Sequence, residues 1–448
     1  MKAVALLSLV LGATLALGRP FTGPENWQMV QTNAVRTWQA RVDAAGLSAG
    51  SGIAVDRKRG ELRLLAEAVG HNRGTTAEFL LIAPLSDRAY EAFGVTVARP
   101  SEIVRAMESL GIRRGAGVGS RPFRFWPVGE PVTVSIRRLD RTPAKDEPLS
   151  SFIEDGQKAS SLSEPGRFIF TGGSWEGERC LTDNRMPAPV FSLYNERLTL
   201  FDLPVQAAKS AVYGRLTVRT ALPSGTLFEL VVRPDRAPDG KPRVLPLVVR
   251  AYKRGNAFFW KVGKEGEKAL FDLPVREGLD RLRALAREGR DLYVGADLDE
   301  SLTLSEATGI SRILVLLDGK GIKLDGRREG GLYPGAFFPQ EKWRTRKDRL
   351  PQPFELHLER DREGKVTRKL VFIEEDWSGE GLDPKLTPRE YPFGAWSEFL
   401  PLVKRVAGPK NKVHMLFIFA PADLPLREIM PGVRASADYL PLVYLFQS

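Results

Sequence analysis

Apolar and polar residues alternate over many short stretches of the chain, and this period of two predicts β-strands. The stretch "GIAVDRKRGELRLLAEAV", which begins at Gly52, alternates on both sides of a Lys-Arg-Gly turn and is typical of a β-hairpin. The run "EFLLIAP", which begins at Glu78, stays apolar up to Pro84 and predicts a buried strand. These patterns predict a β-rich domain over residues 52–236.

Glu78 opens the second of these runs, so its carboxylate either faces a pocket or marks the polar end of a buried strand. A general base normally needs a partner, and the neighbouring sequence offers none. We therefore predict a structural role, in which the Glu78 carboxylate accepts backbone N–H groups or pairs with an arginine.

A helical period appears in "RPSEIVRAMESLGI", which begins at Arg99. Pro100 suits the first position of a helix, and Gly111 suits a left-handed C-terminal cap. Between them, Ile103, Met107 and Leu110 form one apolar stripe. The pattern predicts a helix that packs on one side.

The C-terminal half contains an internal repeat. Residues 243–325 and 354–448 each show a hairpin pattern followed by a helix, a strand, a second helix and a final strand. Three residues recur at a constant offset of 122 positions: Leu302, Leu304 and Glu306 match Leu424, Leu426 and Glu428. This repeat predicts two ββαβαβ units with mixed sheets, joined by a basic linker at 326–353. The whole chain is therefore expected to be an α+β protein.

The start of the chain predicts export. Lys2 precedes an apolar stretch, Ala3 to Leu17, that is too short to span a bilayer comfortably. We expect a signal peptide at 1–18, a connecting segment at 19–51, and a periplasmic or extracellular protein without a transmembrane helix after cleavage. The alternative is that the same stretch is kept as an uncleaved anchor.

Charge points to anionic partners. Lys plus Arg number 66 and Asp plus Glu number 55, so the net charge is +11, and such a surface favours anionic ligands. Export argues against nucleic acid, which leaves a cell-wall polymer or an envelope protein as the expected partner. The alternative is that the charge serves solubility alone.

The densest basic stretch is "EKWRTRKDR", which begins at Glu341. An aromatic ring among cations can hold an anionic or sugar polymer by charge and stacking. The candidate binding residues are Trp343, Arg344, Arg346, Lys347 and Arg349. The alternative is a solvated linker, the usual reading of a charged loop.

No catalytic, cofactor-binding or metal-binding residue is predicted. The three histidines, His71, His357 and His414, are far apart in sequence and lack ligand spacing. Cys180, the only cysteine, lacks a protease signature and is expected to be packed in a strand. The glycine-rich "GAGVGS" at Gly115 follows a predicted helix rather than a strand, which is the wrong order for dinucleotide binding.

Five segments, taken in order, resemble the YdjY-type domain of exported bacterial proteins: "TTAEFLLI", "RPSEIVRAMESLGIRRG", "WPVGEPVTVSI", "FIFTGGSW" and "LPSGTLFELVVRP". The resemblance covers about residues 52–234, and Glu78 matches the glutamate that opens an apolar strand in that family. It implies an exported domain and assigns no activity, because the shared motifs are caps, turns and core positions.

The stretch "ADLPLREIMPG", which begins at Ala422 and leads to a final apolar strand, is similar to the periplasmic domain of the ExbD/TolR biopolymer-transport family. The similarity covers about 243–325 and 354–446. That family has a membrane helix with a proton-handling aspartate, which the stretch from Ala3 to Leu17 lacks. The similarity therefore implies binding to the cell wall or an envelope partner, without proton coupling.

Two functional hypotheses follow. The first is an exported, non-enzymatic envelope protein that acts as a binding or scaffolding module. The alternative is a carboxylate-dependent hydrolase that acts on the wall or on polysaccharide. Two carboxyl groups facing each other across a cleft would favour the hydrolase, whereas a basic groove without such a pair would favour the binding module.

Overall fold

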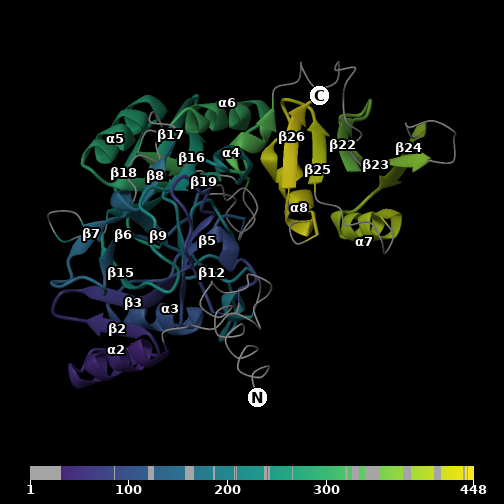
Figure 1. Ribbon diagram of the computed structural model, residues 1–448. Coiled ribbons are helices and arrows are strands. Elements are labelled where there is room, and N and C mark those ends of the chain that lie inside the picture. Colours follow the sequence, from purple (N-terminus) through teal and green to yellow (C-terminus); the bar gives the residue numbers. More distant parts are fainter. Residues whose placement is uncertain are drawn as a thin grey trace. The chain divides into compact units, whose positions relative to one another are not determined.

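The computed structural model divides the chain into two compact units, shown in Figure 1. The first unit holds the described residues up to Val244, and the second holds those from Leu245 to Ser448. The structure describes residues 32–84, 86–119, 126–156, 166–184, 187–205, 207, 209–236, 240, 243–264, 266–317, 321–324, 332–338, 354–376, 385–407, 415–436, 439–440 and 442–448. The predicted signal peptide at 1–18 and the basic stretch at 341–349 lie outside these residues.

The first unit is built on one large mixed sheet. Eight of its strands are, in spatial order, β3 (Glu61–Ala68), β15 (Leu227–Pro234), β6 (Glu130–Arg138), β9 (Arg167–Phe170), β13 (Phe201–Asp202), β12 (Pro189–Ser192), β4 (Phe79–Ile82) and β5 (Ala92–Thr96). Strand β5 also pairs with β3, so these eight strands close into a ring. The sheet continues through β2 (Ile53–Asp56), β1 (Ser48–Gly50) and β7 (Asp146–Pro148).

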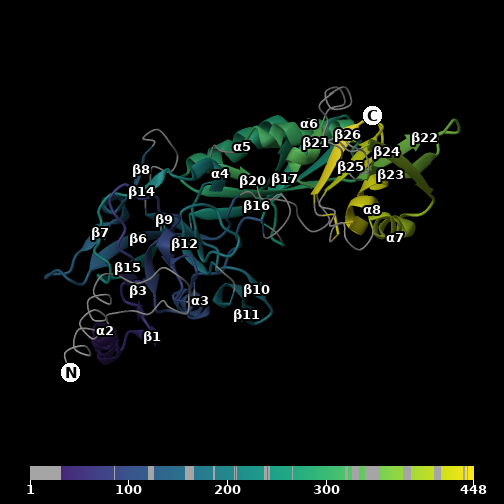
Figure 2. The ribbon, with the colours of Figure 1, turned by 45° about the vertical axis from the view of Figure 1, so that its right-hand side comes forward.

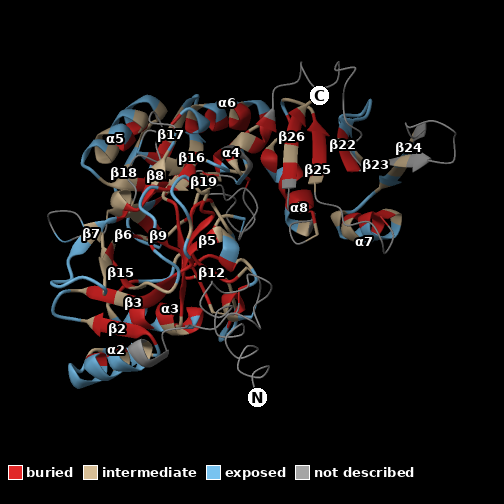
Figure 3. Cartoon of the chain, in the orientation of Figure 1, coloured by how far each residue is buried: buried red, intermediate tan, exposed pale blue. Residues whose placement is uncertain are grey.

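Alternating apolar residues explain the core of this unit. Phe79, Phe168 and Phe191 are fully buried, and Phe191 stacks on Phe201 with 4.0 Å between ring centroids. The predicted hairpin is confirmed as β2 and β3, and "EFLLIAP" contains the buried strand β4. Figure 3 shows how continuous the buried positions are along these strands.

Two helices pack on the sheet of the first unit. Helix α3 (Pro100–Ser109) confirms the predicted helix: Pro100 lies in its first turn, and Ile103 and Met107 are buried. Helix α2 (Thr32–Ala44) lies in the segment 19–51, for which only a connection was predicted. Its Trp38 and Val42 are one helical turn apart and bury their side chains against Ala54 and Leu65, and Val35 packs beside them. Three apolar residues spaced by about one turn therefore anchor this helix.

Short elements complete the first unit. They are β8 (Ile153–Asp155), β10 (Trp175–Glu176), β11 (Arg179–Cys180), β14 (Leu216–Val218), α4 (Lys209–Val212), and the 3-10 turns η2 (Ala89–Glu91), η3 (Leu149–Ser151) and η4 (Leu181–Asp183).

The second unit contains two sheets with the same strand order. In the first repeat the chain runs β16 (Val244–Arg254), β17 (Ala257–Gly263), β18 (Phe271–Pro274), α5 (Val275–Arg287), β19 (Asp291–Leu298), α6 (Leu304–Val315) and β20 (Ile322–Leu324). In the second it runs β22 (Phe354–Arg360), β23 (Val366–Asp376), β24 (Lys385–Phe393), α7 (Trp396–Ala407), β25 (Met415–Ala420), α8 (Leu426–Ser436) and β26 (Leu442–Gln447).

The sheet orders are β18-β17-β16-β19-β20 and β24-β23-β22-β25-β26, so both sheets place their strands in the order 3-2-1-4-5. Each repeat has three strands before its first helix, whereas the sequence predicted two. Strand β21 (Phe337–Phe338), which follows the 3-10 turn η5 (Pro334–Ala336), adds to the edge at β26. Helices α7 and α8 pack against each other beside the second sheet (Figure 2). The chain is thus an α+β protein with mixed sheets.

Equivalent segments of the two repeats are hydrogen-bonded to each other. The backbone N–H of Leu304 donates to the carbonyl of Leu424, and that of Leu426 donates to the carbonyl of Leu302, both at 2.8 Å. A second reciprocal pair joins Ser305 to Ala422 at 2.8 Å and Arg427 to Glu300 at 2.9 Å. Each donor and its counterpart are 122 positions apart, the offset found in the sequence. The repeats therefore pair like the two halves of a symmetric dimer.

None of the helices in the described part of the chain is both long enough and apolar enough to cross a membrane.

Candidate functional site

A basic hollow lies on the surface of the first unit. It has a volume of about 650 Å³ and nine lining residues: Arg57, Lys58, Arg59, Gly60, Ser109, Leu110, Arg233, Pro234 and Arg236. Five of the nine are lysine or arginine, against 66 of 448 in the whole chain, and none is acidic. We refer to this site as the basic hollow.

The β2–β3 turn supplies three of these cations. Asp56 closes the turn, because its Oδ1 accepts the backbone N–H groups of Lys58 and Arg59, both at 3.1 Å. Gly60 then takes a left-handed backbone with φ +62°, which suits glycine. Arg57, Lys58 and Arg59 are exposed in consequence, since a tight turn has no side for them to bury against.

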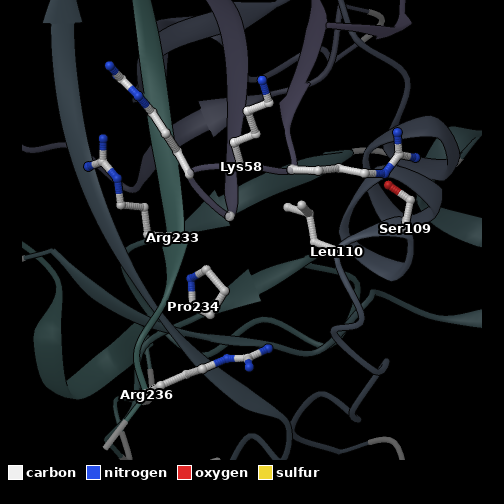
Figure 4. A pocket seen from close by; sticks show the side chains of 9 residues that line it. Lys58, Ser109, Leu110, Arg233, Pro234 and Arg236 are labelled. Atoms are coloured by element: carbon white, nitrogen blue, oxygen red, sulfur yellow. The ribbon is translucent and has the colours of Figure 1, made fainter. Parts of the chain in front are cut away.

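Strand β15 and helix α3 complete the basic hollow. Arg233 and Pro234 end β15, and Arg236 follows it. Figure 4 shows Leu110 and Pro234 lying between Lys58 on one side and Arg236 on the other, so the middle of the hollow is apolar and its edge is cationic. The end of α3 adds a partial negative charge of about half an electron, which is small beside five cations.

Two of the five cations have carboxylate partners. Arg233 contacts Glu61 at 2.5 Å and Asp146 at 2.6 Å. Burial lowers the pKa of Arg233, but the hydrogen bonds that its guanidinium donates to Asp146 and Glu61 outweigh burial and raise the pKa above its usual value. Arg59 lies 3.9 Å from Asp56 and is mostly exposed, so its charge is only weakly compensated.

The other three cations are Arg57, Lys58 and Arg236. Within the described part of the chain, no carboxylate lies within ion-pair distance of them. Because arginine keeps its charge at every physiological pH, the basic hollow holds a standing excess of positive charge. It can bind anionic groups by charge and by the hydrogen-bond forks of its arginines.

Glu78 occupies a different site, where it pairs with a lysine. Lys209 Nζ lies 2.5 Å from Glu78 Oε2 and 5.3 Å from the ring centre of Tyr194. The predicted arginine partner was therefore wrong: the cation is a lysine 131 positions along the chain, and sequence proximity could not reveal it. Burial raises the pKa of Tyr194 well above its usual value.

The cavity beside Glu78 has a volume of only about 10 Å³, room for a single water at most. Glu78 is 6% exposed, and its backbone N–H and carbonyl bond to Glu91 and Leu193. This environment favours the structural role that the sequence suggested, because no substrate-sized space adjoins the carboxylate.

The other residues considered for chemistry are separate or buried. Cys180 is packed in β11, as predicted, and burial raises the pKa of its thiol, which disfavours the nucleophilic thiolate. Within the described residues, no group of three or more His, Cys, Asp or Glu side chains could hold a metal. His414 lies outside these residues, as do the candidate binding residues Trp343, Arg344, Arg346, Lys347 and Arg349.

The basic hollow was not predicted from the sequence, where Arg57 to Arg59 were interpreted only as part of a hairpin turn. The triplet itself was a visible signal, but Arg233 and Arg236 reach the same place only because β15 pairs with β3. Predicting a site from segments this far apart in sequence requires knowledge of the order of strands in the sheet, and the hydrophobic period of the sequence does not provide that order.

Comparisons with known proteins place the chain in no family. No family model matches it, and no curated protein matches it. A solved foamy viral protease-reverse transcriptase in complex with an RNA/DNA hybrid is 11% identical over 45% of this chain and 36% of its own, with a TM-score of 0.13. The native prototype foamy virus protease-reverse transcriptase is 10% identical over 48% and 36%, also with a TM-score of 0.13. The chain spans about a third of the length of these structures, and likenesses this low carry no argument.

Proposed function

We propose that this chain is an exported envelope protein that works by binding rather than by catalysis, and that the basic hollow holds an anionic polymer of the cell wall. The observation that carries the proposal is the convergence of five cations, from two separate stretches of the chain, without a carboxylate among the lining residues. A basic groove of this kind is the feature that favoured a binding module over a hydrolase.

The two units have separate parts in this proposal. The first unit, as a YdjY-type domain, carries the basic hollow. The second, as a duplicated domain of the ExbD/TolR periplasmic type, provides a scaffold or the surface for an envelope protein partner. The shared strand order of its two sheets supports duplication, and the apolar stretch from Ala3 to Leu17 supports export.

The alternative, a carboxylate-dependent hydrolase, has no comparable support. The basic hollow has no acidic lining residue, and the small cavity at Glu78 has one. Glycosidases need two carboxyl groups on opposite sides of a bond, and neither of these two cavities supplies them.

Co-sedimentation with purified cell-wall sacculi tests the proposal. The chain beginning at Arg19 would be compared with the double variant Arg57→Glu/Lys58→Glu and with the control Arg73→Glu/Arg105→Glu. The control changes charge equally, at exposed residues of the same unit outside the basic hollow. We expect retention of the parent and the control at physiological salt, and loss of most retention for the hollow variant. Equal retention of the two variants, or none for the parent, would contradict the proposal.

A further inference from the structure

The charge of the basic hollow is larger than a single anionic group would compensate. Glu61 and Asp146 neutralise Arg233, and Asp56 is shared between Arg59 and Arg63. Arg57, Lys58 and Arg236 have no carboxylate partner in the described part of the chain. Three cations are thus uncompensated and a fourth is partly compensated.

The size of the basic hollow matches a small ligand. The basic hollow is open to solvent and has a volume of about 650 Å³, within the range of small-molecule sites. A carboxylate brings one negative charge, whereas a phosphate monoester brings about 1.5 to 2 at neutral pH. Two phosphates therefore supply the required charge in a compact ligand, and a polymer with one carboxylate per sugar does so only over a longer stretch.

The shape of the basic hollow agrees with such a ligand. Leu110 and Pro234 form an apolar middle between Lys58 and Arg236 (Figure 4). The carbon face of a sugar can rest on this middle while its substituents reach the cations on either side. Four of the five cations are arginines, whose planar forks bind phosphate oxygens in pairs.

We propose that the basic hollow recognises a compact ligand with two phosphate groups, such as a sugar phosphorylated at two positions. This inference rests on the proposed function, because it specifies the anionic group that the same hollow holds. The two phosphates can belong to a lipid headgroup or to a soluble or wall-linked molecule, and the chemistry of recognition is the same.

Calorimetric titration tests the phosphate requirement. The chain beginning at Arg19 would be titrated with inorganic phosphate, pyrophosphate and citrate at physiological salt and without divalent cations. We expect pyrophosphate to bind about tenfold more tightly than phosphate or citrate, because it alone places two phosphates in the hollow. Arg57→Glu/Lys58→Glu should abolish this binding, and Arg73→Glu/Arg105→Glu should leave it unchanged.

The outcomes separate this inference from the proposed function. Retention on sacculi through the basic hollow, with pyrophosphate no better than citrate, would overturn the two-phosphate ligand and leave the envelope role intact. Pyrophosphate binding without retention on sacculi would support the ligand and overturn the wall role. Vesicles of phosphatidylcholine that also contain a lipid with a doubly phosphorylated sugar headgroup then assign the source: pelleting that pyrophosphate competes away indicates a lipid headgroup, and no pelleting indicates a soluble or wall-linked ligand.

Discussion

The ion pair between Glu78 and Lys209 offers a direct test of whether Glu78 is structural. Glu78 is 6% exposed, while the Lys209 side chain is 43% exposed and lies 2.5 Å from it. Replacing Lys209 by methionine keeps a long apolar stem near Tyr194 and removes the charge. The Glu78 carboxylate would then be buried without its cation.

The size of the effect follows from this asymmetry. Removing one partner of a fully buried ion pair costs about 3–5 kcal/mol. Because Lys209 is more than a third exposed, solvent screening reduces the expected loss to about 2 kcal/mol. Glu78→Gln should cost less, about 1 kcal/mol, since the freed Lys209 can turn into water. The double variant should lose less than the sum of the two single changes.

Urea unfolding of the four proteins, followed by fluorescence, measures these losses. For a unit of this size, 2 kcal/mol corresponds to a fall of about 4–8 °C in Tm. Lys58→Met is the matched control, because Lys58 is an exposed lysine without an ion pair in the described structure, and it should stay within about 0.5 kcal/mol of the parent. A loss for Lys209→Met no larger than the control, or strict additivity, would refute the reasoning.

Two further predictions concern buried residues. Asp202 is fully buried, and burial raises its pKa well above the usual value. Its contribution to the free energy of unfolding is therefore greatest below the unfolded pKa of about 4 and is lost as the pH rises toward the folded pKa. Asp202→Asn should flatten this part of the pH profile of stability measured by urea unfolding, and an unchanged slope would contradict the assignment. Leu302 and Leu424 are fully buried at equivalent places in the two repeats, so their alanine variants should each lose about 2–5 kcal/mol and by similar amounts. If the free energy of unfolding fell by very different amounts in the two variants, the two repeats would contribute unequally to the stability of their pairing.

The elements that the sequence predicted well are those with strong local signals. Helix α3 had a proline at its start, an apolar stripe and a glycine after its end. The two repeats have a constant offset of 122 positions, and residues related by this offset make reciprocal hydrogen bonds that join Leu302 and Leu304 to Leu424 and Leu426. The helix depends on residues close together in sequence, and the repeat depends on similarity between two segments of the chain. Neither prediction requires knowledge of the sheet order.

The features that were missed depend on tertiary pairing or on weak patterns. Strand β18 has four residues and ends in proline, and β24 contains Pro388 and Pro392, which argue against a central strand. Both lie at sheet edges, where proline is tolerated. The ring closure between β3 and β5, and the basic hollow near the start of β3, arise from strand pairings that no local period records.

The pairing of the two repeats affects how the second unit can evolve by amino-acid substitution. In a dimer of identical chains every substitution appears twice, whereas here each side of the interface can change alone. Glu300 contacts Arg434 across the interface, but the residues 122 positions away are Ala422 and Arg312, which cannot form that pair. Because one chain carries both halves, their association is also independent of protein concentration, so a weak contact on one side is tolerated even in dilute solution.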